Sequence, residues 1–237
     1  MLSFRRERDV IDSLPLPRVI HRSFYGVLPW RAFTYRQGQT HRPGLYWAAT
    51  SERHVPYESG LELSVLLTLD RDPEVRRILS QPFRMDLNGS DERWHVPDFY
   101  VEGADGSVRV IEVKPTHRLK NRKVRDALGW AQSELQNHGW AYEVRSETPA
   151  QEALNLRFLA GYRRAWQFHN ILLDCVRQET TEQEVFRALE WRISEATGVS
   201  KPVVRSHLLH LLWRGDLVAD LSLPLDVHTL LAPGRRQ

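Results

Sequence analysis

The chain has 237 residues, which is enough for one large domain or two modest ones, each with a buried core. Hydrophobic residues make up 41% of the sequence and charged residues 27%, a balance typical of soluble globular proteins. No apolar run approaches the roughly 18 residues that a membrane-spanning helix needs, and the stretch MLSFRRERDV is charged where a signal peptide would be apolar. Cys175 is the single cysteine, which excludes an internal disulfide and a cysteine-based zinc site. We therefore expect a cytoplasmic protein with no membrane association.

The formal net charge of +3 is modest, but arginine greatly outnumbers lysine among the basic residues. Arginine recognises phosphate groups through paired hydrogen bonds, so this composition favours a nucleic-acid partner. A GC-rich genome would produce the same excess of arginine, and the composition alone leaves the partner undecided.

Residues 1–42 are basic, aromatic and punctuated by proline and glycine. Alternating cations and rings could grip a sugar-phosphate backbone and stack on distorted bases. The alternative is that the rings pack an irregular arm onto the core while the arginines stay in water. The Pro43-Gly44 turn, followed by Leu45-Tyr46-Trp47, predicts the entry into the first folded domain.

The segment Pro56–Asp70 is expected to form a helix. Proline is tolerated in the first turn of a helix, and the apolar residues of this segment recur at helical spacing. Glu58 and Glu62 are four residues apart, which would place both carboxylates on one helix face. Asp72-Pro73 predicts the helix end, and Val75–Phe83 is expected to form a short turn or helix followed by an extended segment.

The segment Arg93–Pro115, RWHVPDFYVEGADGSVRVIEVKP, predicts a β-hairpin. Asp98 begins the first strand, an Asp-Gly turn reverses the chain, and the second strand runs into Glu112-Val113-Lys114. Alternation along that strand puts Glu112 and Lys114 on one face. The hairpin thus brings two carboxylates and an ammonium group together, although desolvating such charges side by side is costly.

A divalent cation would explain this arrangement of charges. Asp98 and Glu112 offer hard oxygen ligands suited to Mg²⁺, which also binds phosphate oxygens. Lys114 would orient a metal-activated water, or offset the charge that develops on the phosphate during hydrolysis. The alternative is a surface hairpin whose Glu112 and Lys114 simply face water, since motifs this short often occur by chance. Gln81 and His95 stay outside the expected catalytic set, because polar residues near a hairpin are commonly structural hydrogen-bond partners.

Residues 116–123 follow the hairpin directly and are strongly basic. The candidates for contacts with phosphates beside the scissile bond are Lys120, Arg122 and Lys123. The same residues would also suit the solvated start of a helix. Apolar residues at helical spacing from Val124 to Leu135 predict this helix, Asn137-His138-Gly139 ends it, and Trp140–Arg145 is expected to be a strand. This order of elements matches an α/β core with a mixed central sheet flanked by helices.

The C-terminal part is expected to be mainly helical. An amphipathic region from Pro149 to about Cys175 would cover the core, and helices are then predicted at Thr180–Arg192, Ile193–Gly198 and Val203–Arg214, before a strand pair. This is the order of a winged helix-turn-helix, whose third helix reads DNA. The residues of that helix expected to face DNA are Lys201, Arg205 and His207. Small helical units also dock onto partner subunits, so protein binding is the alternative.

The hairpin with its Pro-Asp and Glu-x-Lys signatures resembles the PD-(D/E)xK nucleases of the restriction-endonuclease-like superfamily. More closely, the chain from about Arg42 to Arg164 resembles the TnsA-like endonuclease subunit of heteromeric bacterial transposases. The motifs that carry this resemblance are Tyr57–Leu63, Leu69–Val75, Ser80–Phe83, His95–Phe99 and Val113–Pro115.

The resemblance implies a restriction-endonuclease-like fold and the catalytic set Glu62, Asp98, Glu112 and Lys114, with the three carboxylates as ligands of Mg²⁺ or Mn²⁺. In the family the glutamate of Glu-x-Lys is sometimes replaced by glutamine, whereas this chain has Glu112. We accordingly predict an N-terminal arm over residues 1–42, a nuclease domain over residues 43–165 and a winged-helix-like domain over residues 166–237.

The function implied is that of a DNA endonuclease subunit that cleaves the 5′ ends of a mobile element during cut-and-paste transposition. Its partners would be double-stranded DNA at the transposon ends and an integrase-type (DDE) transposase subunit that cleaves the 3′ ends, with an AAA+ regulator as a further candidate. Two alternatives stay open: a stand-alone restriction or repair endonuclease with the same site, and a non-catalytic DNA-binding adaptor.

Overall fold

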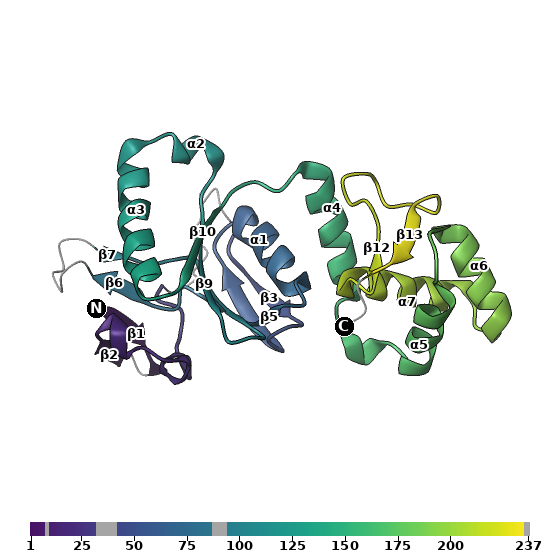
Figure 1. The fold of residues 1–237 in the computed structure, drawn as a ribbon, viewed down its shortest axis with the longest axis horizontal. Coiled ribbons are helices and arrows are strands. Elements are labelled where there is room, and N and C mark those ends of the chain that lie inside the picture. Colours follow the sequence, from purple (N-terminus) through teal and green to yellow (C-terminus); the bar gives the residue numbers. More distant parts are fainter. Residues whose placement is uncertain (8–9, 32–41, 87–93, 235–237) are drawn as a thin grey trace. The chain divides into compact units, whose positions relative to one another are not determined.

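The computed structural model describes residues 1–7, 10–31, 42–86 and 94–234 (Figure 1). Two compact units make up the chain. Unit 1 comprises Met1–Leu66 and Glu74–Glu147, and unit 2 comprises Leu67–Pro73 and Thr148–Gln237. None of the helices in the described ranges is long and apolar enough to cross a membrane.

A mixed four-stranded sheet forms the centre of unit 1, in the order β10-β9-β8-β5. Strands β5 (Val75–Ser80), β8 (Phe99–Gly103) and β9 (Val108–Val113) pair antiparallel, and β10 (Ala141–Arg145) lies parallel to β9. The predicted hairpin is confirmed as β8–β9, and the predicted strand after Gly139 as β10. The expected turn or helix after Val75 is wrong, because this segment is extended from its first residue and pairs with β8.

Two helices of this part of the chain are seen on opposite sides of the sheet, α1 (Gly60–Arg71) and α3 (Arg122–Asn137) (Figure 1). Helix α3 buries Ala131 and Leu135 against the sheet residues Tyr100, Val108 and Val110. The short helix α2 (Thr116–Leu119) precedes it. The mixed α/β organisation expected from the order of elements is therefore present in unit 1.

The N-terminal residues belong to the core of unit 1. Strand β1 (Leu2–Arg5) pairs with β2 (Ile11–Leu14) and with β6 (Arg84–Asp86), and β7 (Trp94–His95) completes this second sheet. Short 3-10 turns follow at Leu16–Arg18 and His21–Phe24. Phe24 is 1% exposed and stacks on Tyr100 with 4.0 Å between ring centroids, so at this position the packing interpretation of the aromatic residues holds.

The predicted domain limits at residues 42 and 165 do not coincide with the compact units. Phe4 is fully buried in the core of unit 1, which is why the first residues do not form a separate arm. Residues 148–165 cluster with the C-terminal part of the chain. The second part of the predicted arm, residues 32–41, lies outside the described residues.

The expected helix start at Pro56 is wrong. Pro56 lies in β4 (Arg53–Tyr57), which among the described residues pairs with β3 (Gly44–Ala48) alone, in a two-stranded sheet. Proline is accepted there because an edge strand does not need every backbone N–H. Helix α1 begins at Gly60 instead, so Glu58 precedes the helix and does not share a helix face with Glu62.

Unit 2 is built around α7 (Lys201–Arg214), whose residues 207–213 are all buried. Helices α4 (Ala150–Leu159), α5 (Asn170–Glu179) and α6 (Phe186–Thr197) contact it. Two 3-10 turns, Ala160–Tyr162 and Ala165–Gln167, connect α4 to α5. Three short strands, β11 (Glu184–Val185), β12 (Leu217–Val218) and β13 (Leu230–Pro233), form a sheet in the order β11-β13-β12.

Two helix predictions in unit 2 need correction. The segment Thr180–Arg192 is not one helix, because Glu184 and Val185 pair with β13 before α6 begins at Phe186. The helices predicted on either side of residue 193 are one continuous helix, which ends at Gly198, a glycine with a φ of +69° that L-residues adopt with difficulty.

Candidate functional site

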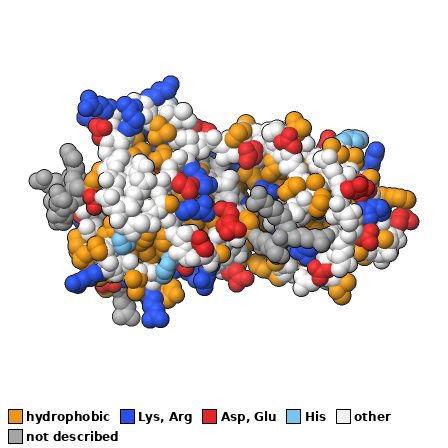
Figure 2. Space-filling model, viewed as in Figure 1, with side chains coloured by type: hydrophobic (Ala, Val, Ile, Leu, Met, Phe, Trp, Pro, Cys, Tyr) orange, Lys and Arg blue, Asp and Glu red, His pale blue; other side chains and the backbone are white. Residues whose placement is uncertain are grey.

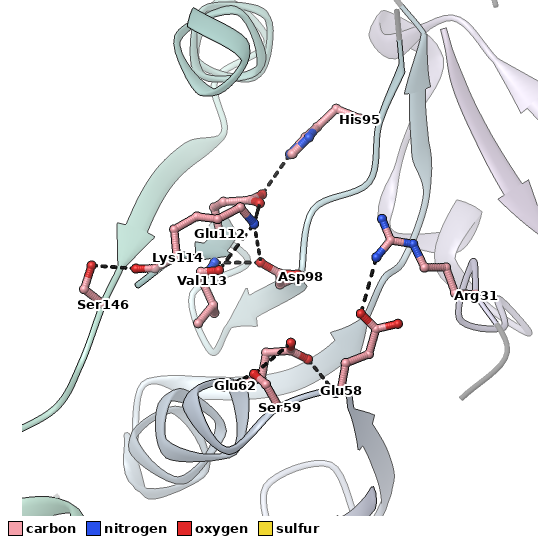
Figure 3. A network of polar contacts seen from close by, with 10 residues as sticks. All are labelled: Arg31, Glu58, Ser59, Glu62, His95, Asp98, Glu112, Val113, Lys114 and Ser146. Atoms are coloured by element: carbon pink, nitrogen blue, oxygen red, sulfur yellow. Dashed lines mark hydrogen bonds and ion pairs between the residues drawn. The ribbon is translucent and has the colours of Figure 1, made fainter. Parts of the chain in front are cut away.

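The candidate site lies at the ends of β8 and β9 in unit 1. Phe99 pairs with Ile111, so the next positions, Asp98 and Glu112, lie opposite each other across the strands. Lys114 follows β9, and its Nζ lies 3.5 Å from Asp98 Oδ2 and donates a hydrogen bond to Glu112 Oε1 (Figure 3). The structure therefore brings together three of the four residues predicted to be catalytic.

The carboxylate of Asp98 is held by the backbone of the neighbouring strand. The N–H of Val113 donates to Asp98 Oδ2 at 2.7 Å, and the Asp98 side chain is 13% exposed. Burial and, after it, the charge of Glu112 raise the pKa of Asp98 to about 8. Two carboxylates facing each other away from water do not both ionise readily, and this pair shows that conflict.

Glu112 is only 1% exposed, which rules out a surface hairpin whose glutamate faces water. Its two oxygens have different partners: Oε2 lies 2.8 Å from His95 Nε2, and Oε1 contacts Lys114. Burial alone would raise the pKa of Glu112, but the contacts with His95 and Lys114 outweigh it and lower the pKa. Glu112 is thus the carboxylate of the pair that stays ionised.

Lys114 is partly accessible, with 29% of its side chain exposed. Desolvation would lower its pKa, but Asp98 and Glu112 overcome this effect and raise it, so the ammonium stays charged. A cation with access to solvent beside two acids can meet an incoming phosphate or water.

Glu62, the fourth predicted catalytic residue, serves the start of α1 in this structure. Ser59 Oγ donates to Glu62 Oε1 and accepts from Glu62 N–H, both at 3.1 Å, so Ser59 caps the first turn of α1 with the residue spacing of a capping box. The N–H of Glu58 also donates to Glu62 Oε2 at 2.7 Å. Figure 3 shows this carboxylate bonded to Ser59 and to the backbone of Glu58, and in the described residues no hydrogen bond or ion pair joins it to Asp98, Glu112 or Lys114. It is nevertheless near enough to interact with them through its charge: after burial and Glu112, Glu62 also contributes to the raised pKa of Asp98. Burial raises the pKa of Glu62.

Sequence reasoning did not assign two residues that touch this site. His95 contacts Glu112 directly, and Gln81 N–H donates to the carbonyl of Asp98 at 2.9 Å. Gln81 has a φ of +44°, is 1% exposed, and accepts the N–H groups of Trp30 and Arg31 through its backbone and side-chain oxygens. The only signal of these positions in the sequence was their place in the Ser80–Phe83 and His95–Phe99 motifs.

The predicted phosphate contacts after the hairpin are exposed. Lys120, Arg122 and Lys123 lie around the start of α3, where Asn121 caps the helix by accepting the N–H of Lys123. Arg122 pairs weakly with Asp126 at 3.7 Å. In Figure 2 blue side chains gather at this end of unit 1, so the surface there is open to a polyanion.

The three DNA-facing residues predicted in unit 2 differ in their surroundings. Lys201 is exposed at the start of α7. Arg205 donates to both oxygens of Glu190, at 2.7 and 3.0 Å, and Glu190 is 3% exposed. The expectation for His207 is wrong, because its side chain is 2% exposed and accepts the N–H of His169.

The donor set of the site fits a hard divalent cation. Asp98 and Glu112 supply carboxylate oxygens, and a cation between them would offset the burial and the repulsion that together raise the pKa of Asp98. No group of three or more His, Cys, Asp or Glu side chains in the described ranges is arranged to hold a metal. Mg²⁺ suits such a site, because it keeps several waters and needs few protein ligands.

Comparison with known proteins gives one family. Residues 72–147, about a third of the chain, match the family model of the TnsA-like endonuclease N-terminal domain. The matched region contains Asp98, Glu112, Lys114 and His95, and leaves Glu62 outside. No curated protein matches the chain.

Proposed function

Because the chain carries a TnsA-like endonuclease N-terminal domain over residues 72–147, we propose that it is a metal-dependent DNA endonuclease that hydrolyses phosphodiester bonds. The observation that carries this proposal is the contact of Lys114 with Asp98 and Glu112 at the strand ends. Burying two acids beside a partly exposed ammonium destabilises the folded state, because the charges lose water. The same arrangement can stabilise negative charge that develops on a phosphate during hydrolysis.

In this proposal Asp98 and Glu112 hold Mg²⁺ or Mn²⁺. The bound ion would supply Lewis acidity and lower the pKa of a water molecule. Lys114 orients the attacking water and offsets negative charge on the phosphate as the transition state forms. Glu62 would contribute a third carboxylate, since its two oxygens keep free acceptor sites beside their hydrogen bonds with Ser59 and the N–H of Glu58.

The exposed basic residues would place the DNA. Lys120, Arg122 and Lys123 are suited to phosphates flanking the scissile bond, since such contacts position a nuclease without reading sequence. In unit 2, the element order α5, β11, α6, α7, β12, β13 and the sheet β11-β13-β12 support a winged helix-turn-helix. Lys201 would then contact DNA directly, whereas Arg205 would have to leave Glu190.

We further propose that the chain acts as the nuclease subunit of a heteromeric transposase and cleaves the 5′ ends of a mobile element. The family match supports a nuclease related to transposase subunits. An integrase-type partner would cleave the 3′ ends, and an AAA+ protein would regulate the assembly. A stand-alone nuclease would cleave specific DNA without such a partner. Measuring DNA cleavage by the purified chain with and without the integrase subunit therefore distinguishes a transposase subunit from a stand-alone nuclease.

The main competitor is a non-catalytic DNA-binding adaptor. The use of the Glu62 carboxylate in the cap of α1 favours it, because a structural role explains that residue without catalysis. The deciding experiment is nicking of supercoiled plasmid in Mn²⁺ by wild type, Asp98→Ala and Lys114→Ala, with the exposed Asp126→Ala on α3 as matched control.

Activity in wild type and Asp126→Ala, lost in the other two variants, is expected. Equal nicking by all four proteins would assign the activity to a contaminant. If none of them nicks DNA with or without the partner subunit, the adaptor is the better description.

A further inference from the structure

His95 reaches the site from a different sheet. It lies in β7, where it pairs with Met85 of β6, and its side chain is 16% exposed. Its Nε2 lies 2.8 Å from Oε2 of Glu112, which belongs to the central sheet. Figure 3 shows the imidazole on the side of Glu112 opposite Asp98. The contact therefore ties two sheets of unit 1 together at the candidate catalytic glutamate.

The orientation of a glutamate carboxylate is not fixed by its own torsions. Rotation about the last bond of the side chain is broad, so hydrogen-bond partners determine where the two oxygens point. Lys114 contacts Oε1 but is a flexible, partly exposed side chain. The imidazole of His95 has only two torsions and is 16% exposed, against 29% for Lys114, so it is the more rigid partner of the two.

We propose that His95 is a positioning residue of the nuclease site: its Nε2–H holds Oε2 of Glu112 and thereby keeps Oε1 directed at Lys114 and the cation position. This inference rests on the proposed function and names how the protein prepares its glutamate for the metal. His95 acts through Glu112. Partners of this kind that orient a metal-binding carboxylate typically change metal affinity or activity by about 10–100-fold when removed.

Two amide substitutions separate positioning from simple space filling. The side-chain nitrogen of glutamine lies about as far from Cα as His Nε2, whereas the nitrogen of asparagine lies closer, near the position of Nδ1. His95→Gln therefore keeps a donor within reach of Glu112, and His95→Asn and His95→Ala do not. His228→Ala in unit 2, at an exposed histidine, is the control for loss of an imidazole.

The experiment measures Mn²⁺ binding to the full-length chain without DNA, from the rise in unfolding temperature with metal concentration, and plasmid nicking in parallel. We expect His95→Ala and His95→Asn to raise the half-saturating Mn²⁺ concentration about 10–100-fold, with His95→Gln and His228→Ala close to wild type. If His95→Ala has the same half-saturating Mn²⁺ concentration as wild type, His95 is a structural residue only, even if the variant unfolds at a lower temperature without metal. A glutamine variant as defective as alanine would also overturn the proposal.

Failure of the underlying function looks different. If wild type shows neither a Mn²⁺-dependent rise in unfolding temperature nor nicking, the metal-dependent nuclease is refuted, and the role of His95 with it. If wild type responds to Mn²⁺ and the histidine variants match it, only the positioning role is lost.

Discussion

Replacing Asp98 by asparagine is expected to stabilise unit 1 in metal-free solution, by an amount that grows with pH. Burial and the neighbouring charge of Glu112 raise the pKa of Asp98 from 3.8 to about 8. Between these values the folded state keeps a proton that the unfolded state has released. Because the folded state then binds more protons, the free energy of unfolding of wild type falls as pH rises through this range, and levels off above it.

The size of the stabilisation follows from the size of the pKa shift of Asp98. One pKa unit corresponds to about 1.4 kcal/mol, so the rise of about four units in the pKa of Asp98 corresponds to on the order of 6 kcal/mol at pH 8 and above. Relaxation and water entry reduce such penalties in real proteins, and we expect about 2–4 kcal/mol to be measured. Asparagine has the same shape, still accepts the N–H of Val113, and carries no charge. Near pH 4 the two proteins should therefore differ little.

The assay is urea unfolding in EDTA at pH values from 5 to 9, with hydrogen exchange of peptides from β8 and β9 reporting on unit 1 alone. Taking the difference between variant and wild type cancels other titrating groups, including His207 and His210, whose pKa values are lowered by burial. Asp126→Asn, at a carboxylate that is 69% exposed, is the control and should show a constant difference. A difference for Asp98→Asn that does not grow between pH 5 and pH 8 would refute the reasoning.

Three further predictions concern the metal, the cap of α1 and unit 2. At pH 8, Mg²⁺ is expected to raise the unfolding temperature of wild type and not that of Asp98→Asn, and equal shifts in calorimetry would contradict the assignment of the carboxylate. Ser59→Ala removes the capping hydroxyl of α1 and is expected to lower the free energy of unfolding, measured in urea, by about 1 kcal/mol. An unchanged free energy of unfolding would mean that the cap does not stabilise the protein. Arg205→Ala leaves the buried Glu190 without its guanidinium partner and is expected to lower the free energy of unfolding by about 1–3 kcal/mol. Lys201→Ala should leave the free energy of unfolding unchanged. In anisotropy titrations it should reduce the salt dependence of DNA binding by about one phosphate contact. Loss of stability in Lys201→Ala and weaker salt dependence in Arg205→Ala would instead make Lys201 the structural residue and Arg205 the DNA contact.

The hairpin could be predicted because two local signals agree. Alternating apolar residues predict the strands, and the Asp-Gly turn provides the glycine that the reversal requires, since Gly106 has a φ of +82°. The end of α3 was predictable for the same reason, because the helical spacing of apolar residues stops at Leu135 and Gly139, with a φ of +85°, follows one turn later. In both places one short segment contains all the information that determines its structure.

The helix start before the site was predictable in principle but was placed too early. Proline suits the first turn of a helix and an edge strand equally well, and Pro56 is in the strand. The decisive signal was the spacing of Ser59 and Glu62, which is that of a capping box and marks the helix boundary.

The contacts of His95 and Gln81 could not be predicted from the local sequence. His95 meets Glu112 only because β7 and β9, in different sheets, end at the same place, and nothing within a few residues of His95 encodes that. Gln81 takes a left-handed backbone conformation without being glycine, and its hydrogen bonds to Trp30, Arg31 and Asp98 join three distant segments. Strain of this kind persists only where the surrounding structure imposes it, so it is visible only in the fold.

The electrostatics of the site favour one of its two interpretations. A structural hairpin would either leave Glu112 in water or replace one acid by an apolar residue, because a lone lysine does not balance two desolvated carboxylates. In this chain Glu112 is 1% exposed, and the pKa of Asp98 is raised because burial and Glu112 disfavour its charge. The fold therefore retains an arrangement that weakens it whenever Asp98 ionises. A divalent cation removes that penalty and uses the same two carboxylates as ligands, which makes a metal site the simplest physical reason for keeping both acids beside Lys114.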